Sequence, residues 1–492
     1  MEKFPQRGGR GKTARLLPPK RVVKKYIGCP GVIKVTDKQM RKRVWPRLLI
    51  GLGLVIVAAA VTWFTIALSE SEVNGDRAPY LQMTGPDRVT LRWGTAKAGQ
   101  GEVYYGLQPD QLSRQQAEVK SSKNHRVILR GLQPYSRYYY RVKQAGKWLM
   151  PQPEWFHTSP KIGAEVPTRI WVIGDPGEPD AHDAVSKNTY QWLEAHARPG
   201  RPLLDFILTT GDNAYPNATN AQYESGFFKP FGNYFKNISV WPAFGNHDAR
   251  RWVFYRIFDR PLLGELGGVA SHDKAYFSFD YGRIHIVMLD SEHGDLSRTS
   301  PMLAWLKQDL KQTRQDWVIV DFHHPPYTSG THKSDNPNDS AARMVKVREN
   351  LAPILDQAGV DLVFSGHSHD YERSPLIDCH YGDSTTFKPW MIKDKGEKDA
   401  AGVTHYRKAH TGLSPYDGTM YIVEGSSGEG HKVEHPLPVM VATSARPGSL
   451  LLDIQGQTLT GRYLTSTGNV ADTFTITKGV NEKAPISQGC KK

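Results

Sequence analysis

The longest apolar stretch of the chain covers residues 48–68. These 21 residues carry no charge, and a helix of that length crosses a hydrocarbon core of about 30 Å. A helix buried in a soluble core would show a polar face, whereas here only Thr62 and Thr65 interrupt the apolar residues. The pattern predicts a transmembrane helix over 48–68. A cleaved signal peptide is the alternative, because Ala67 and Ser69 are small residues at the offsets of a cleavage site, but signal peptides usually have apolar regions of about 7–15 residues.

Short runs of alternating polar and apolar residues fill the segment 72–160. They are separated by turn residues and include VTLRW, GEVYYG and RYYYRVKQ. Alternation with a period of two is typical of strands that bury one face, and short strands at this spacing predict an all-β sandwich. The segment holds no cluster of titratable residues, so we interpret it as a scaffold.

The pattern changes again over residues 167–480. Five apolar, β-branched runs each end at a small polar cluster, in RIWVIGDPG, LLDFILTTGDNAY, VWPAFGNHD, WVIVDFHHPPY and VDLVFSGHSHDYER. Helix-like stretches lie between several of them, such as 300–313, whose apolar residues are spaced for one face. Alternating strands and helices predict a layered α/β domain. The polar clusters should converge, because the carboxyl ends of strands meet at the site in such sheets.

The charge of the chain is concentrated at its start. Residues 1–47 hold 15 of the 63 Lys and Arg residues and 2 of the 49 Asp and Glu residues, which leaves 48 basic and 47 acidic residues in the rest. The overall charge of +14 therefore does not indicate a body that binds nucleic acid, and no nucleic-acid partner is expected. The tail lacks large apolar residues in any period, so we expect it to be disordered.

The charge asymmetry around the apolar stretch predicts an orientation. Basic residues precede it and acidic residues follow it, which places the tail in the cytoplasm and the body outside, in the periplasm or the extracellular space. The protein is thus expected to be a single-pass, membrane-anchored protein whose basic tail lies on anionic lipid. Three cysteines exclude a disulfide framework and a zinc-thiolate site, and allow at most one bridge, from Cys379 to Cys490.

Each polar cluster alone is weak evidence for a site. Gly-Asp is a common turn, so Asp175 or Asp212 could be an ordinary loop residue. His367 and His369 flank one serine, and residues two apart on an extended chain share a face. Hard carboxylates, Asn246 and histidines together at strand ends form a mixed oxygen and nitrogen donor set. Such a set suits iron, zinc or manganese rather than calcium.

In this order and strand context, the clusters resemble the five sequence blocks of the purple acid phosphatases, a branch of the calcineurin-like metallophosphoesterases. The blocks are Asp175 with Gly177, then 211–215, 245–248, His323 and 366–369. The segment before them resembles the fibronectin type III-like domain of the same family, and the resemblance covers about residues 78–480. It implies a catalytic domain of two mixed sheets flanked by helices.

The resemblance also implies a ligand set for a binuclear centre. It places a ferric iron on Asp175, Asp212, Tyr215 and His369. Asp212 bridges to a divalent ion, zinc, iron or manganese, which is also held by Asn246, His323 and His367. Hard anionic donors suit the trivalent ion, and imidazoles with an amide oxygen suit the divalent one.

Two further histidines are expected to act on the substrate. The resemblance implies that His247 binds the phosphoryl oxygens or protonates the leaving group, and that His332 contacts the substrate. His324 would point away from the site and pack elsewhere. Residues 371–373 should hold their loop by hydrogen bonds. The segment 374–416 has no counterpart in the family and either rims the pocket or is a surface insertion.

These expectations predict a phosphatase. Two metals can clamp the attacking and departing oxygens of a phosphate ester and supply hydroxide near neutral pH, so we expect hydrolysis of phosphate monoesters, at acidic pH. A phosphodiesterase and a nucleotide or phytate phosphatase remain alternatives, as does a non-catalytic, membrane-anchored binding protein. No Gly-rich loop with Lys-Ser/Thr is present, which excludes a P-loop enzyme. The oligomeric state stays open.

Overall fold

The computed structural model describes residues 61–62, 73, 75–484 and 489–490. Within these residues, no helix combines the length and the apolar character needed to span a bilayer. The predicted tail 1–47 lies outside the described residues, as does the predicted span 48–68 apart from two residues. Both stay predictions. The described residues from 73 onward belong to one compact unit.

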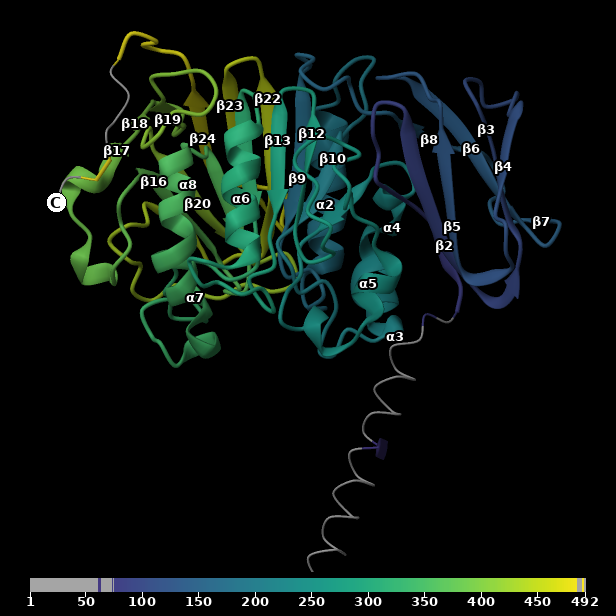
Figure 1. The fold of residues 1–492 in the computed structure, drawn as a ribbon, viewed down its shortest axis with the longest axis horizontal. Helices are drawn as coiled ribbons and strands as arrows, with labels where there is room; N and C mark the ends of the chain where they lie inside the picture. Colours follow the sequence, from purple (N-terminus) through teal and green to yellow (C-terminus); the bar gives the residue numbers. More distant parts are fainter. Residues whose placement is uncertain (1–60, 63–72, 74, 485–488, 491–492) are drawn as a thin grey trace, which may run out of the picture. The chain divides into compact units, whose positions relative to one another are not determined.

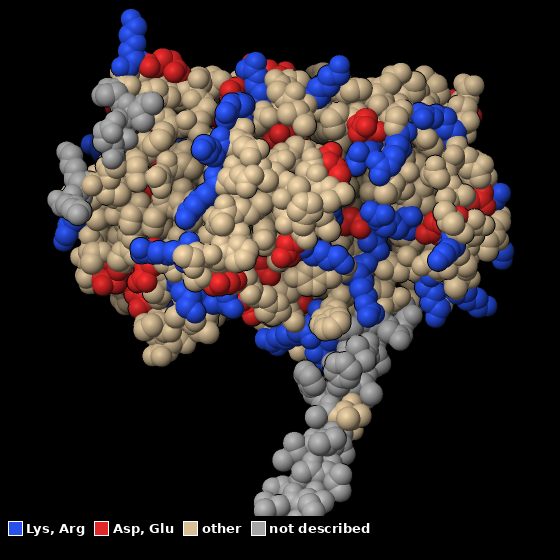
Figure 2. Space-filling model, viewed as in Figure 1, with Lys and Arg blue, Asp and Glu red and all other residues tan. Residues whose placement is uncertain are grey.

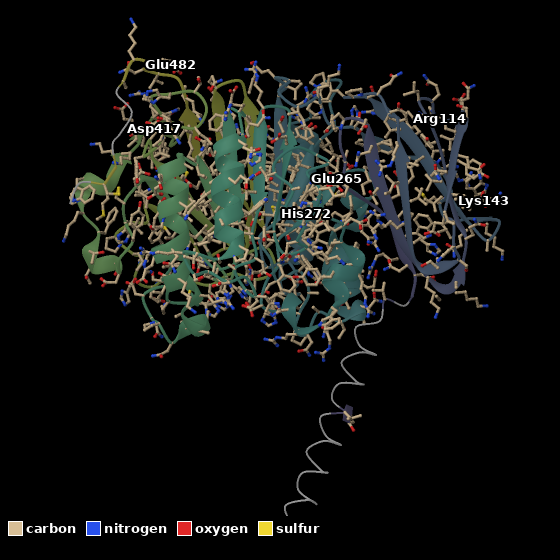
Figure 3. The ribbon with its side chains drawn as sticks, viewed as in Figure 1. Arg114, Lys143, Glu265, His272, Asp417 and Glu482 are labelled. Carbon is tan, nitrogen blue, oxygen red and sulfur yellow. A yellow bond between two sulfur atoms is a disulfide. The ribbon has the colours of Figure 1, made fainter. Side chains whose placement is uncertain are left out.

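A small all-β domain comes first and confirms the prediction for this part of the chain. One sheet has the order β1-β2-β5 and the other β4-β3-β6-β7, with β8 beside β6. Figure 3 labels Arg114 of β4 and Lys143 of β6 on this domain. The strands are β1 (Arg77–Gln82), β2 (Arg88–Gly99), β3 (Gly101–Gly106), β4 (Arg114–Ala117), β5 (Ser122–Arg130), β6 (Arg137–Gln144), β7 (Lys147–Trp148) and β8 (Glu154–His157). Its closer resemblance to fibronectin type III domains stays a prediction.

The first large sheet has the order β11-β10-β9-β22-β23-β24-β19-β18 (Figure 1). Its strands β9, β10 and β11 are parallel, so their carboxyl ends meet at one edge. The strands are β9 (Thr168–Ile173), β10 (Phe206–Thr209), β11 (Val240–Pro242), β18 (Glu397–Lys398), β19 (Thr404–Arg407), β22 (Gly448–Gln455), β23 (Thr458–Thr465) and β24 (Val470–Thr477).

The second large sheet has the order β12-β13-β14-β15-β20-β16-β17, with β21 beside β16. Strands β13, β14, β15 and β20 are parallel. The strands are β12 (Phe277–Tyr281), β13 (Ile284–Met288), β14 (Trp317–Asp321), β15 (Leu362–Ser365), β16 (Tyr371–Ile377), β17 (Ile392–Asp394), β20 (Thr419–Glu424) and β21 (Ala442–Ser444).

Helices cover the outer faces of both sheets, so the order of layers is helix, sheet, sheet, helix. Trp171 lies on the outer face of the first sheet and packs against α2 and α4. Val320 lies on the outer face of the second sheet and packs against α6 and α8. Ile170 and Ile319 point inward into the core that the two sheets share. The α-helices are α2 (His182–Ala195), α3 (Asn220–Tyr223), α4 (Lys229–Phe235), α5 (Val253–Ile257), α6 (Pro301–Gln312), α7 (Arg343–Lys346) and α8 (Ala352–Ala358).

Helix α6 confirms the helix predicted over 300–313. Ser300 is its N-cap, and the Ser300 hydroxyl accepts a hydrogen bond from the backbone N–H of Leu303 at 3.3 Å. Such a cap satisfies a backbone donor that has no partner within the helix. Pro301 at the first helical position needs no backbone donor, so the local sequence and the observed start of the helix agree.

The segment 374–416 is part of both large sheets. It supplies the edge strand β17 to the second sheet and strands β18 and β19 to the first. Cys379 in this segment forms a disulfide with Cys490, which confirms the one bridge that the cysteine count allows.

The small β domain packs against the first large sheet and its helices. The Tyr80 hydroxyl donates to the Ile257 carbonyl at 2.6 Å, and the Tyr140 hydroxyl donates to the Lys236 carbonyl at 2.6 Å. Arg92 forms an ion pair with Asp259 at 3.2 Å. On the face shown in Figure 2, basic and acidic side chains are interspersed, as expected for a body with balanced charge.

Candidate metal centre

All seven predicted ligands lie in loops that follow parallel strands. Three of these loops leave the first sheet after β9, β10 and β11, and two leave the second sheet after β14 and β15. Side chains from the two sets of loops come within hydrogen-bonding distance of one another, as between Asn246 and His323 at 3.0 Å. The expected convergence of the five polar clusters is therefore confirmed by the fold.

One group of donor atoms surrounds the Tyr215 hydroxyl. It lies 3.1 Å from Asp175 Oδ1, 3.1 Å from Asp212 Oδ2 and 3.0 Å from His369 Nε2. His369 Nε2 is also 3.5 Å from Asp175 Oδ1. We call these four side chains the tyrosine group.

A second group surrounds His323 Nε2. This atom lies 3.0 Å from Asn246 Oδ1, 3.2 Å from Asp212 Oδ2 and 3.2 Å from His367 Nδ1. We call these four side chains the histidine group. Because Asp212 Oδ2 belongs to both groups, the seven donors form two adjoining sets around one shared carboxylate. Carboxylate, phenol, imidazole and amide donors at these separations fit a pair of metal ions.

The backbone is strained where it carries these donors. Asp175, Asp212 and His367 have positive φ angles of 50°, 48° and 69°, a region that residues other than glycine seldom occupy. Gly211 precedes Asp212 with a φ of 105°, and a side chain at Gly211 would come within 2.6 Å of His323 Nδ1. Strain of this kind persists where the surrounding structure imposes it, and it gathers at functional sites.

Each histidine of the two groups has one ring nitrogen that faces the other donors, its inward nitrogen. The second ring nitrogen, its outward nitrogen, contacts an oxygen outside the group. His323 Nδ1 is 2.9 Å from the Thr210 carbonyl, His369 Nδ1 contacts the Glu429 carboxylate, and His367 Nε2 is 2.6 Å from Ser340 Oγ. A proton on the outward nitrogen leaves the lone pair of the inward nitrogen free for a metal. No pattern in the sequence marks Glu429 or Ser340, because they lie 60 and 27 residues from their histidines.

Electrostatics couples the shared carboxylate to the histidine beside it. Burial opposes the charge of Asp212, but His323 and His247 outweigh burial and lower the pKa of Asp212. Burial likewise opposes the charge of His323, whereas Asp212 and Asp175 raise the pKa of His323 to about 10. The site therefore favours a positive charge beside Asp212, which a bound cation would also provide.

His247 lies at the edge of the tyrosine group. Its ring centroid is 4.0 Å from that of Tyr215, and its backbone N–H donates to Asp212 Oδ1 at 2.7 Å. His247 Nδ1 is 2.8 Å from the Pro216 carbonyl, so Nε2 is the nitrogen left for a substrate. Burial lowers the pKa of His247 in spite of the nearby Asp212 carboxylate.

His332 lies against the histidine group. Its ring stacks on the ring of His367, with centroids 3.7 Å apart and planes 18° apart, and His332 Nδ1 is 2.8 Å from Asp339 Oδ1. His324 is buried and contacts Ser291 Oγ through Nδ1 at 2.9 Å, and its ring centroid is 4.4 Å from that of His367. His324 thus packs, as expected, but it packs against the ring of His367 and does not point away from the site.

Residues 371–373 hold neighbouring segments by hydrogen bonds, which confirms their predicted role. The Tyr371 hydroxyl donates to Asp472 at 2.8 Å, and Arg373 Nε donates to the same carboxylate at 2.7 Å. Glu372 accepts hydrogen bonds from the Thr328 hydroxyl and the Ser329 backbone N–H. These last two bonds fix the loop that carries His332.

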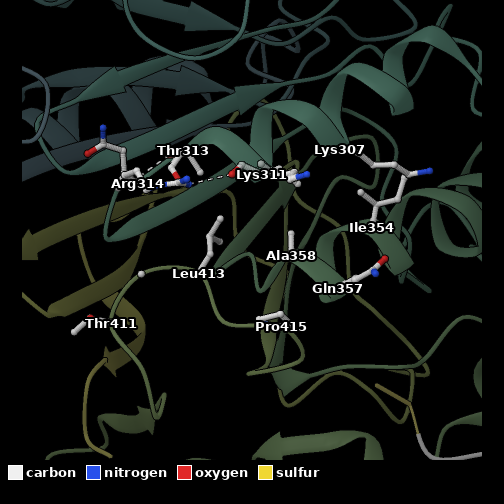
Figure 4. A pocket seen from close by; sticks show the side chains of 13 residues that line it. Lys307, Lys311, Thr313, Arg314, Ile354, Gln357, Ala358, Thr411, Leu413 and Pro415 are labelled. Atoms are coloured by element: carbon white, nitrogen blue, oxygen red, sulfur yellow. Dashed lines mark hydrogen bonds between the residues drawn. The ribbon is translucent and has the colours of Figure 1, made fainter. Parts of the chain in front are cut away.

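A separate cavity of about 650 Å³ lies between α6, α8 and the segment 411–415 (Figure 4). These three segments precede β14, β15 and β20, so the cavity lies at the opposite edge of the second sheet from the two donor groups. Lys307, Lys311 and Arg314 line it, but Arg314 Nη1 already donates to the carbonyls of Lys311 and Thr313. None of the predicted site residues lines this cavity.

Comparisons with known families divide the chain in the same way. Residues 168–371 match the calcineurin-like phosphoesterase family, and residues 77–159 match the purple acid phosphatase N-terminal domain. Both matches lie within the domains predicted over 167–480 and 72–160.

Curated relatives include purple acid phosphatases from plants. Identity is 27% over 312 residues with purple acid phosphatase 23 of Arabidopsis thaliana, 26% over 338 residues with purple acid phosphatase 18 of the same plant and 29% over 266 residues with the enzyme of Glycine max. The alignments cover 57%, 65% and 51% of this chain and span 63%, 71% and 53% of those proteins. For two of the three, the chain spans less than two thirds of the relative.

Two solved structures share the fold. Purple acid phosphatase PPD1 from yellow lupin (Lupinus luteus) aligns over 85% of this chain and 78% of its own, with a TM-score of 0.63 and 17% identity. PhoD aligns over 80% of this chain and 87% of its own, with a TM-score of 0.56 and 13% identity. These two structures show the fold, while the family matches identify residues 168–371 as a calcineurin-like phosphoesterase domain and residues 77–159 as the N-terminal domain of the purple acid phosphatases, a family that implies a binuclear metal centre.

Proposed function

We propose that this protein is a binuclear metal phosphatase that hydrolyses phosphate monoesters, with an acidic working pH. The observation that carries the proposal is the pair of donor groups that share Asp212 Oδ2, 3.1 Å from the Tyr215 hydroxyl and 3.2 Å from His323 Nε2. A shared carboxylate between two donor sets is suited to two metals about 3.5–4 Å apart. The similarity to plant purple acid phosphatases supports the same activity.

The tyrosine group is proposed to hold ferric iron and the histidine group a divalent ion, zinc, iron or manganese. Three oxygen donors with one imidazole suit the harder trivalent ion, and two imidazoles with an amide oxygen suit the divalent ion. When bound, the metal pair would supply hydroxide and offset the charge of the phosphate. The outward nitrogens of His323, His367 and His369 each contact an oxygen. These contacts keep the proton on the outward nitrogen and leave the lone pair of the inward nitrogen free for a metal.

His247 and His332 are proposed to act on the ester itself. His247 Nδ1–H donates to the Pro216 carbonyl, which leaves Nε2 for the substrate. When the ring is protonated, as an acidic working pH favours, Nε2–H would donate a hydrogen bond to a phosphoryl oxygen or a proton to the leaving oxygen. His332 is held by Asp339 and by its stacking on His367, beside the histidine group. A phosphate between the two histidines would be oriented from both sides.

The test is turnover by the purified full-length protein. It should hydrolyse an aryl phosphomonoester at acidic pH, lose the activity when its metals are removed by a chelator and regain it with iron and zinc. A bis-aryl phosphodiester, a nucleotide and phytate should be poorer substrates. Preference for one of these three would replace the monoester hypothesis by that alternative. Metal binding without turnover of any of them would favour a non-catalytic binding protein.

We also propose that residues 48–68 anchor the protein in a membrane, with residues 1–47 in the cytoplasm and the body in the periplasm or outside the cell. The charge asymmetry of the sequence supports this topology, and the Cys379–Cys490 disulfide supports an oxidising compartment for the body. Protease added to intact cells or spheroplasts should digest the body and spare the tail. A body that is protected would reverse the topology, and a mature N-terminus near residue 70 would indicate a signal peptide.

A further inference from the structure

A turn beside the histidine group contains three consecutive left-handed residues that are not glycine. Ser340, Ala341 and Ala342 have φ angles of 49°, 52° and 61°. Residues other than glycine adopt this conformation at a cost in free energy, so a run of three is unfavourable unless contacts in the folded protein fix it. The residues that precede and begin the turn make such contacts with the site.

Hydrogen bonds connect this turn to two histidines. Ser340 Oγ is 2.6 Å from His367 Nε2 and 2.8 Å from Asp339 Oδ1. The same Asp339 oxygen is 2.8 Å from His332 Nδ1, and the His332 ring stacks on the His367 ring. The four side chains thus form a closed circuit of three hydrogen bonds and one ring stack.

The direction of these hydrogen bonds follows from the carboxylate. Burial raises the pKa of Asp339, but the hydrogen bonds from His332, Lys333 and Ser340 outweigh burial and lower it. An ionised carboxylate accepts hydrogen bonds and donates none. The Ser340 hydroxyl must therefore donate to Asp339, and its oxygen is left to accept a hydrogen bond from His367 Nε2–H.

This direction fixes the tautomer of His367. With the proton on Nε2, the lone pair is on Nδ1, the nitrogen that lies 3.2 Å from His323 Nε2 within the histidine group. We propose that Ser340 is a positioning residue that holds His367 in the tautomer and orientation needed to bind the divalent ion. The left-handed turn places the Ser340 hydroxyl beside His367 Nε2. The hydrogen bond from this hydroxyl to Asp339 leaves the Ser340 oxygen to accept from His367. The inference rests on the proposed function, because it assigns His367 as a ligand.

A third metal among His332, Asp339 and His367 is the competing explanation, since donor atoms of these three residues lie within 4.8 Å of one another. The ring stack argues against it. Two imidazoles with planes 18° apart and centroids 3.7 Å apart direct their in-plane lone pairs side by side rather than toward one point. The contacts among these side chains are instead those of hydrogen bonds that support one metal ligand, His367.

The experiment measures zinc binding to the full-length protein after its metals are removed by a chelator. In calorimetry, Ser340→Ala should bind one of two zinc ions about 10–100-fold more weakly than the wild type, the usual effect of losing an outer hydrogen bond to a ligand. The control is Ser297→Ala, because the exposed Ser297 hydroxyl also donates to an aspartate, Asp295 at 2.9 Å, and belongs to neither donor group. That control should bind both zinc ions like the wild type.

A second variant separates positioning from folding. Ser340→Gly removes the hydroxyl but also relieves the positive φ, so it should melt at or above the wild-type temperature and still bind one zinc ion weakly. Equal zinc affinity in the wild type, Ser340→Ala and Ser340→Gly would overturn the inference and leave the proposed function standing. A wild type that binds two zinc ions but hydrolyses no ester would overturn only the function. A wild type that binds no metal would overturn both.

Discussion

Asp212 is the residue on which both donor groups depend, because one of its oxygens contacts Tyr215 and His323 alike. Its other oxygen accepts a hydrogen bond from the His247 backbone. A single side chain therefore links the two groups with the loop that carries Asn246 and His247. Substitutions of the residues around Asp212 should fall into two classes. One class should weaken metal binding, and the other should leave both metals bound and slow the reaction of the substrate.

Tyr215→Phe should remove the visible colour of the protein while iron stays bound. A phenolate on ferric iron gives a charge-transfer band in the visible, whereas carboxylates and imidazoles do not. Phenylalanine keeps the ring that packs 4.0 Å from His247 and loses only the donor oxygen. The check is a visible spectrum together with the iron content of the wild type and the variant. Oxidised iron in a colourless wild type would show that Tyr215 is not a ligand.

Asn246→Ala and His247→Ala should differ in their response to added metal. Loss of the Asn246 amide oxygen removes a donor 3.0 Å from His323 Nε2, so activity should fall and recover partly with excess zinc. His247→Ala should keep both metals and lose activity by about 10²–10⁴-fold if His247 donates a proton. The measurements are kcat/KM and metal content across a zinc titration. The same recovery in both variants would show that one of the two roles is wrong.

At the scale of elements, strand β16 controls the loop that carries His332. Glu372 of β16 accepts hydrogen bonds from Thr328 and Ser329 at the start of that loop. Burial and the neighbouring Asp370 raise the pKa of Glu372, so this side chain takes up a proton more readily than an exposed glutamate. A neutral amide should then replace it well at acidic pH.

We therefore expect Glu372→Gln to resemble the wild type at about pH 5.5 and Glu372→Ala to be less stable. The alanine variant leaves two buried donors without an acceptor, which costs about 2–3 kcal/mol of unfolding free energy, and frees the His332 loop so that kcat/KM falls. Urea unfolding and steady-state kinetics on the two variants provide the comparison. Equal behaviour of both would mean that Glu372 does not hold the loop.

The elements that the sequence predicts well are those with a strong pattern of burial. Strands β9, β10, β11, β14 and β15 are buried along their whole length, and their polar ends locate all seven donors. The short edge strands β17 and β18 have two or three residues, none of them buried, so no alternation marks them. Ser340 and Glu429 could not be found either, because their roles depend on contacts that only the fold creates.

At the scale of the whole molecule, a buried ion network joins the second sheet to helix α6. His285 of β13 is 2.7 Å from Asp280 of β12 through Nδ1 and 2.8 Å from Asp309 of α6 through Nε2. Burial opposes the charge of His285, but the two carboxylates outweigh it and raise the pKa of His285 to about 9. The folded protein thus holds this proton more tightly than the unfolded chain does, whose histidine pKa is about 6.5.

The stability that His285 contributes should be complete below about pH 6.5 and should be lost as the pH rises through 9. The difference between the two pKa values corresponds to about 3 kcal/mol. The check is the unfolding free energy of the wild type and His285→Gln between pH 6 and 9.5, in which the gap between the two proteins should narrow as the pH rises. A gap that does not change with pH would mean that His285 is neutral in the folded protein.

The two donor groups each take side chains from both large sheets. The first sheet supplies Asp175, Asp212, Tyr215 and Asn246, and the second supplies His323, His367 and His369. The core residues packed between the two sheets, such as Ile170 and Ile319, fix the distance between the sheets and therefore influence the spacing of the donors. Substitutions of apolar core residues that contact no ligand should therefore change the affinity for metal. Metal affinity would then report how closely the two sheets pack against each other.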